Sequence, residues 1–344
     1  MFGQKLNPGF NKEEYIELLK VNAKIGESER FKDFPYPQTF KMVYRSPEVG
    51  FANMWELWLR PDNVAVISIR GTTVEKSSWL ANLYEGMAKA KGSIKLSGKD
   101  TFSYDLSNNP KAGVHAGWLI SMGFLANDIL PKIDSCYKSG IKDFFIVGHS
   151  QGGAISYLLT AYLNTLRKNR RIEKDIQFKT YCSAAPKPGN LYFAYEYEKV
   201  TMDGWAYNVV NSSDWVPEVP ISIQTLGDLN IVNPIENANG LIRKVKFPKN
   251  IILSRVFHHL NKTTQKASLT YQKFLGKKLE EKVTERFNGF ELPELLPSFN
   301  YVRTGNIIVL EGDDDYFKHY PKQTDKIMEH HNPYAYLFLA NKLN

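Results

Sequence analysis

The sequence places a serine between two glycines where an apolar run meets a helix-compatible run. Residues 144–147 read Phe-Phe-Ile-Val, Gly148, Ser150 and Gly152 follow, and residues 154–166 favour a helix. A G-x-S-x-G pattern at a strand–turn–helix junction is typical of a nucleophile elbow, whose glycines leave room for a strained serine. A simple glycine-serine turn between a strand and a helix is the alternative interpretation.

A serine hydroxyl is a weak nucleophile at neutral pH, so a reactive serine requires a histidine base and an acid that orients it. In elbow proteins the chain order is serine, acid, histidine. His330 and His331 satisfy this order and lie on a predicted loop before Asn332, whereas His115 precedes the serine and His149 adjoins it on the wrong side. The remaining histidines are interpreted as surface or packing residues: His258, His259 and His319.

The acid should follow a strand and lie between the serine and the histidine. Asp214 follows a predicted strand at residues 207–210, and Pro217 and Pro220 stiffen the chain after it. An Asx-type turn is the alternative role for Asp214. Chain order favours a catalytic role. Three other aspartates fit less well: Asp175, Asp203 and Asp228.

Alternating strands and helices predict how these residues are positioned. Residues 64–69 are nearly all apolar, as in a strand covered on both faces, and they end in a loop that can donate a backbone N–H to an oxyanion. The alternation over residues 141–212 predicts a mainly parallel sheet. Further predicted elements are helices at residues 11–25 and 191–199, strands at 40–45, 54–59 and 178–182, a helix from Trp118 with a kink or break at Pro131, and a hairpin of 301–302 with 307–310.

Two segments interrupt this alternation of strands and helices. Residues 74–113 are polar and contain glycines, so they are predicted to form a surface loop or a mobile lid, with a helical piece at 79–89. Residues 216–300 are interpreted as a cap or insertion with a polar helical stretch at 251–287. The chain is therefore predicted to be one domain, residues 1–344, with a cap at 216–300.

Composition narrows the class of protein. The 344 residues are 43% hydrophobic and 23% charged, and no apolar run approaches the roughly 20 residues that span a bilayer. The formal net charge of +8 is interpreted as lysines scattered over a solvated surface, with attraction to anionic lipid as the alternative. Nothing indicates nucleic-acid binding.

The two cysteines and one acidic cluster are given structural interpretations. Cys136 and Cys182 are predicted to be separate buried thiols, and residues 313–315 are predicted to form an exposed acidic turn rather than a calcium site.

The first four residues resemble an artificial start joined to a mature chain. We therefore expect a secreted or periplasmic protein whose signal peptide has been removed.

Several separated motifs resemble, in their shared order, the class 3 lipases, the fungal-lipase-like family of α/β-hydrolases. They are residues 69–72 with 78–83, 114–118, 148–154 and 211–217, and His331 with Tyr334. The resemblance implies an α/β-hydrolase fold, with a mainly parallel sheet flanked by helices, and no cofactor or metal. Two features depart from the family: Gln151 replaces the more usual leucine, and Asp214 and His331 are 117 residues apart.

The resemblance implies Ser150 as nucleophile, Asp214 as acid and His331 as base, with the backbone N–H groups of Thr72 and Gln151 forming the oxyanion hole. The expected reaction is hydrolysis of carboxylic esters of lipids through an acyl-enzyme, with triacylglycerol as the favoured substrate. Phospholipase A1 and short-chain carboxylesterase activity are the alternatives within this class, and a non-catalytic lipid-binding protein is the alternative outside it. The expected partners are the lipid ester and, transiently, a lipid interface.

Overall fold

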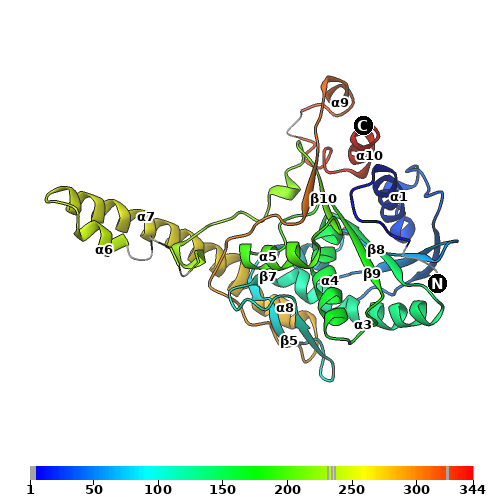
Figure 1. Ribbon diagram of the computed structural model, residues 1–344, viewed down its shortest axis with the longest axis horizontal. Helices are drawn as coiled ribbons and strands as arrows, with labels where there is room; N and C mark the ends of the chain where they lie inside the picture. The colour runs from blue at the N-terminus through cyan, green and yellow to red at the C-terminus, as the bar shows by residue number, and fades with distance from the viewer. Residues whose placement is uncertain (1–4, 231, 234, 236–237, 323–324, 344) are drawn as a thin grey trace.

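A seven-stranded sheet runs through the centre of the part of the chain that the structure describes (Figure 1). The structure is a computed structural model and describes residues 5–230, 232–233, 235, 238–322 and 325–343. The strands, in sheet order, are β1 (Lys41–Arg45), β2 (Trp55–Arg60), β3 (Val64–Ile69), β8 (Asp143–His149), β9 (Gln177–Ser183), β10 (Ala206–Asn211) and β11 (Asn306–Leu310). The pairs β1–β2 and β2–β3 are antiparallel and all other neighbours are parallel. The predicted α/β fold with a mainly parallel sheet is confirmed.

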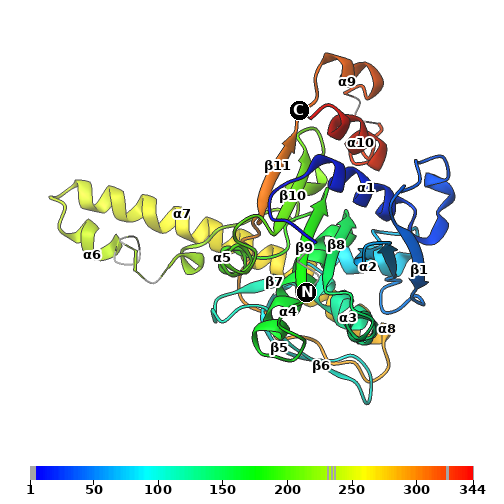
Figure 2. The same cartoon turned by 45° about the vertical axis from the view of Figure 1, so that its right-hand side comes forward.

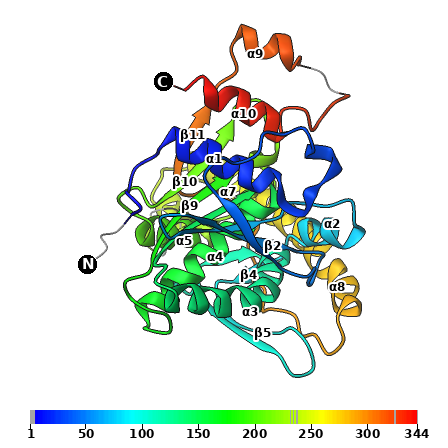
Figure 3. The ribbon, with the colours of Figure 1, turned by 90° about the vertical axis from the view of Figure 1, so that its right-hand side faces the viewer.

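Helices cover both faces of this sheet, which explains the continuous apolar runs of its central strands. Every residue of β3 and β8 is buried. Because successive side chains of a strand point to opposite faces, Ile67 and Ile146 pack in one core, whereas Val66 and Val147 pack in the other. Figure 3 shows α1 (Lys12–Ala23) and α10 (Pro333–Asn341) on one side of the sheet, and α3 (Ala116–Lys138) and α4 (Gln151–Lys168) on the other.

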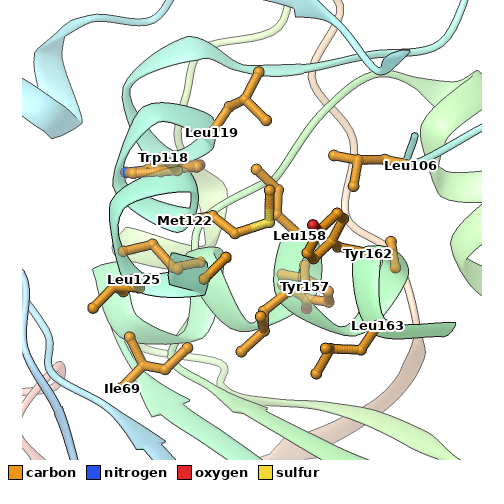
Figure 4. Close-up of a cluster of buried hydrophobic side chains, with 14 of the residues drawn as sticks. Ile69, Leu106, Trp118, Leu119, Met122, Leu125, Tyr157, Leu158, Tyr162 and Leu163 are labelled. Atoms are coloured by element: carbon orange, nitrogen blue, oxygen red, sulfur yellow. The ribbon is translucent and has the colours of Figure 1, made fainter. Parts of the chain in front are cut away.

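The larger core lies where α3 meets α4. Leu119 and Met122 of α3 point toward Leu158 and Tyr162 of α4 (Figure 4). The predicted break at Pro131 does not occur, since α3 continues to Lys138. The neighbouring residues Ile129 and Ile133 are buried in this core, and their packing outweighs the hydrogen bond that the proline removes.

The prediction of a surface loop at residues 74–113 is largely wrong, and a mobile lid in this segment stays a prediction. α2 (Lys76–Leu83) ends six residues before the predicted limit, and two short antiparallel pairs follow. These are β4 (Met87–Lys89) with β7 (Gly113–His115), and β5 (Lys91–Lys95) with β6 (Thr101–Asp105). Phe102, Tyr104 and Leu106 are buried in the core with α3. Their two-residue spacing is a strand signal that the surrounding polar residues hide.

The predicted hairpin of residues 301–302 with 307–310 is also wrong. β11 pairs in parallel with β10, and Val302 forms an isolated bridge with Gly189. The free edge of β10 supplies the hydrogen bonds that β11 requires, and a hairpin would leave that edge unpaired. The predictions for α1, β1, β2, β9, β10 and α5 (Leu191–Val200) agree with the structure to within a few residues, and Cys136 and Cys182 are buried and free.

The segment predicted as a cap contains several helices. They are the short turns Val216–Glu218 and Leu226–Asp228, α6 (Ala238–Arg243), α7 (Lys249–Tyr271), the π-helix Gln272–Gly276, the 3-10 turn Lys277–Leu279 and α8 (Glu280–Arg286). Figures 1 and 2 show α6 and α7 projecting away from the sheet, whereas α8 lies beside it. The remaining helices are Ile25–Glu27 and Glu29–Phe31, both 3-10, and α9 (Asp314–His319). In the described residues, none of the helices has the length and apolar character needed to span a membrane. A covering role for residues 216–300 stays a prediction.

His115 joins β7 to α3 and is fully buried. Its Nδ1 accepts a hydrogen bond from the backbone N–H of Trp118, which leaves Nε2 to donate to the carbonyl of Asn82. Burial lowers the pKa of His115 to about 3. The imidazole is therefore neutral in the folded protein at every pH near neutrality.

We expect acid to destabilise the protein through His115. The folded protein keeps this histidine neutral down to a pKa of about 3, whereas the unfolded chain binds a proton near the usual pKa of 6.5. The unfolded state therefore binds more protons between these values, and the free energy of unfolding falls as the pH drops below about 6.5. His115→Gln should recover about 2 kcal/mol of this loss at pH 5 relative to pH 7.

Urea unfolding of the wild type and His115→Gln at pH 5 and pH 7 measures this difference. The matched control is His319→Gln, which removes an exposed imidazole and leaves the buried one in place. Equal pH dependence in the wild type and His115→Gln would contradict the assignment.

Candidate active site

Ser150 occupies a strained turn between β8 and α4. Its backbone has φ 61° and ψ −130°, a left-handed conformation that residues other than glycine rarely adopt. Glycine is required on both sides of Ser150, because other backbone atoms lie too close to leave room for a Cβ. A Cβ on Gly148 would lie 2.2 Å from the carbonyl carbon of Gly152, and a Cβ on Gly152 would lie 2.3 Å from the carbonyl oxygen of Ile69. The predicted strand–turn–helix around Ser150 is present.

Asp214 and His331 form a buried hydrogen-bonded pair. Nδ1 of His331 donates to Oδ2 of Asp214 at 2.7 Å, because an ionised carboxylate can only accept. The same carboxylate accepts from the hydroxyl of Tyr336 at 2.7 Å and from the backbone N–H of Val216 at 2.9 Å. This tautomer leaves Nε2 of His331 as an acceptor, and Nε2 is buried without a hydrogen-bond partner among the described residues.

The two adjacent histidines have different environments. Nδ1 of His330 is 2.7 Å from the hydroxyl of Tyr316, and its carbonyl accepts from the side chain of Asn211. His330 is thereby held against α9, away from Asp214. Of the two candidates, only His331 contacts the acid, so the geometry favours His331 as the base.

His149 supports the backbone of His331. Its Nε2 donates to the carbonyl of His331 at 2.8 Å, and its Nδ1 accepts from the hydroxyl of Ser183. Burial lowers the pKa of His149 to about 3, so the ring stays neutral. The rings of His149 and His331 are 5.0 Å apart, and Ser150 directly follows His149. This contact brings the elbow and His331 together at the carboxyl edge of the sheet.

The loop after β3 runs against the elbow. A Cβ on Gly71 would lie 2.9 Å from the carbonyl oxygen of His149 and 3.6 Å from Cβ of Ser150. The next residue, Thr72, accepts a hydrogen bond at its hydroxyl from the side chain of Asn82 at 2.9 Å. The backbone of Thr72 is therefore held beside Ser150, where an oxyanion donor is required.

Gln151 ties the start of α4 to α2. Its Nε2 donates to the carbonyl of Ser78 at 3.0 Å and to Oδ1 of Asn82 at 2.9 Å, and its Oε1 accepts from the hydroxyl of Ser78. Trp118 also donates to Oδ1 of Asn82. Sequence reasoning considered only the backbone N–H of Gln151. The side chain of Gln151 contacts Asn82, and Asn82 contacts Thr72. Asn82 therefore links the two residues proposed to form the oxyanion hole.

Sequence analysis also missed Tyr336, Asn82 and the partner role of His149. The signal for Tyr336 was weak, because nothing but its position five residues after His331 connects it with the site in the sequence. The remaining polar candidates lie elsewhere. His258 and His259 are exposed on α7, His319 is exposed on α9, and the acidic turn pairs with Lys342 through Asp313 and Asp315.

Comparisons with known proteins find similarity to lipases. Residues 66–223 match the family model for lipase (class 3). The secreted mono- and diacylglycerol lipase 1 of Fusarium solani is 28% identical over 156 residues, which are 45% of this chain and 39% of that protein, so the match spans well under half of this relative. Among solved structures, lipase II from Rhizopus niveus is 19% identical, with 61% of this chain and 75% of that chain covered and a TM-score of 0.46. Lip2 lipase from Yarrowia lipolytica is 22% identical, with 61% and 72% covered and a TM-score of 0.45.

The family match contains Thr72, Ser150, Gln151 and Asp214 and ends before α6, α7 and His331. Residues 66–223, which carry the serine elbow on a mainly parallel sheet, are therefore similar to the class 3 lipase family of α/β-hydrolases.

Proposed function

We propose that this protein hydrolyses carboxylic esters of lipids by a serine mechanism. Ser150 is the nucleophile, His331 the base and Asp214 the acid. The observation that carries this proposal is the state of His331: Nδ1 is bound to Asp214, and Nε2 is buried without a partner at the edge of the sheet where Ser150 lies. An unprotonated imidazole nitrogen in this position is what a serine nucleophile requires.

In the first half of the reaction, Oγ of Ser150 attacks the ester carbonyl carbon while Nε2 of His331 takes the hydroxyl proton. Asp214 remains a carboxylate and stabilises the imidazolium, and Tyr336 holds Asp214 in place. The backbone N–H groups of Thr72 and Gln151 stabilise the tetrahedral oxyanion, and the positive end of the α4 dipole adds to this field.

In the second half, the tetrahedral intermediate collapses, the ester C–O bond breaks, and the alcohol leaves with the proton from Nε2 of His331. Water then attacks the acyl-enzyme while Nε2 of His331 takes its proton. The bond between the acyl carbon and Oγ of Ser150 breaks, Oγ takes the proton from His331, and the fatty acid leaves.

Acylglycerols are the proposed substrates. Triacylglycerol is the expectation from the sequence, and the name of the Fusarium solani relative adds mono- and diacylglycerols. Phospholipase A1 and short-chain esterase activity share the same mechanism and differ only in the acyl and head-group site. That relative is also named as secreted, which supports the proposal that this protein is exported.

The central test is covalent labelling together with initial rates. A fluorophosphonate should label the wild type at Ser150, and Ser150→Ala should lose the label and lower kcat/KM by at least about a thousandfold. Rates on mono-, di- and triolein emulsions, phosphatidylglycerol vesicles and p-nitrophenyl butyrate rank the substrate classes.

The matched control is Ser156→Ala, on the same helix, because the Ser156 hydroxyl bonds only to the backbone carbonyl of Gly152 in the described structure. This variant should keep both label and activity. A folded wild type that neither labels nor hydrolyses any of these esters would refute the proposal and favour a non-catalytic lipid-binding protein.

Gln151→Leu should slow the reaction although leucine is common at this position in the family. The change removes the side-chain bonds to Ser78 and Asn82 and leaves buried polar atoms unpaired, which costs about 1–3 kcal/mol of stability. The loop that carries Thr72 loses one of its supports, so we expect kcat to fall about tenfold with a smaller change in KM.

Thr160→Val is the matched control for Gln151→Leu. It removes a buried hydrogen bond to Thr180 in the middle of the same helix. It should lower the unfolding free energy comparably, as measured by urea denaturation, and leave kcat unchanged. If both variants lower kcat equally, the side chain of Gln151 has no positioning role.

A further inference from the structure

The excess of positive over negative charge is concentrated in one segment of the chain. Residues 238–279 contain ten lysines and arginines and no aspartate or glutamate, whereas the rest of the chain contains 34 basic and 36 acidic residues. This segment therefore accounts for the whole net charge of +8, and the interpretation of scattered lysines is wrong. The ten residues are Arg243, Lys244, Lys246, Lys249, Arg255, Lys262, Lys266, Lys273, Lys277 and Lys278.

The same segment exposes apolar side chains. It holds nine of the 24 large hydrophobic residues that are exposed in the described structure. Most of the segment is the projecting pair of helices α6 and α7, residues 238–271, here called the arm (Figures 1 and 2). Because the arm stands away from the sheet and lies outside the lipase match at 66–223, neither the fold nor the family explains its exposed apolar surface.

The arm is amphipathic along α7. Ile252, Val256 and Leu260 recur every four residues and so form one stripe, with exposed fractions of 60%, 50% and 59%. Lys262 and Lys266 lie on the neighbouring face of the helix and are exposed. A basic flank beside an apolar stripe is the pattern of helices that lie in the plane of a membrane surface.

The turn between α6 and α7 repeats this pattern. Phe247 is 78% exposed, and the lysines on either side, Lys246 and Lys249, are also exposed. Between the two helices and the turn at residues 226–229 lies an apolar hollow of about 640 Å³, lined in part by Leu241, Phe257 and Leu260.

We propose that the arm docks on the surface of an anionic lipid layer. The stripe on α7 and Phe247 enter the boundary between head groups and acyl chains, and the lysines and arginines contact the lipid phosphates. A second copy of the arm is disfavoured because its charges are all positive. A nucleic acid is also disfavoured, because its phosphates would pair with the basic side chains but the apolar stripe would remain exposed to water. This docking adds a lipid surface to the proposed hydrolysis of lipid esters and brings the enzyme to its substrate.

Vesicle co-sedimentation tests the docking apart from catalysis. The protein carries Ser150→Ala so that the lipids stay intact. It should bind vesicles of phosphatidylcholine with 30% phosphatidylglycerol, bind pure phosphatidylcholine at least about tenfold more weakly, and lose binding as salt is raised.

Two arm variants separate charge from apolar insertion. Lys262→Gln with Lys266→Gln should weaken binding about thirtyfold, from about fivefold for each charge. Ile252→Ser with Val256→Ser should weaken it severalfold or more at unchanged charge. The matched controls are Lys138→Gln with Lys168→Gln, and Tyr195→Ser with Met202→Ser, all exposed residues outside the arm, and both pairs should bind as the parent does.

Circular dichroism, and rates on soluble p-nitrophenyl butyrate with Ser150 restored, should be unchanged in the arm variants, because the arm contains no residue of the active site. Docking is refuted if the arm variants bind like their controls, or if neutral and anionic vesicles bind equally. It is also refuted if sedimentation velocity shows a dimer that the arm variants dissociate while vesicles are not bound. Vesicle binding by a protein that hydrolyses no ester would uphold the docking and refute the proposed function instead.

Discussion

The hydrogen bond between Asp214 and His331 is the constraint on which the rest of the site depends. Both side chains are buried, at 0% and 6% exposure, so the carboxylate requires partners to offset its lost hydration. Tyr336 and the backbone of Val216 supply them. Because Tyr336 lies on α10, the acid, the histidine loop and the last helix form one connected unit. This unit joins chain segments that are 117 residues apart.

The elbow satisfies a different requirement, which is steric. The strained backbone of Ser150 is accommodated because Gly148 lies against the start of α4, and Gly152 against the end of β3, so closely that neither has room for a side chain. Polar side chains hold the loop of Thr72, which faces Ser150. Gln151, Asn82 and Trp118 link α4, α2 and α3 through partly buried hydrogen bonds, and this network supports the loop of Thr72. Sterics therefore position the serine, whereas hydrogen bonds position the loop facing it.

The active-site residues and the proposed docking surface lie in different parts of the chain. The sheet and the helices that pack on it carry the active-site residues, and the rest of the sequence outside the arm and the stretch that follows it is close to electrically neutral. The arm carries the excess charge and exposed apolar residues and no active-site residue. Such separation lets a docking surface vary without disturbing the buried pair, because in the part of the chain that the structure describes the arm contributes no hydrogen bond to Asp214 or His331.

Local patterns in the sequence determined the elbow and the strands β3 and β8, because glycine spacing and continuous apolar runs act over a few residues. The G-x-S-x-G pattern named Ser150, chain order named Asp214, and resemblance to a family named His331. Only the tertiary structure decided that residues 87–115 form strands, that β11 pairs in parallel, and that Gln151, His149 and Tyr336 orient the site. The β10–β11 pairing, the contact of His149 with His331 and the contact of Tyr336 with Asp214 join residues that lie about 100 or more positions apart. Such pairings have no signature within a short stretch of sequence.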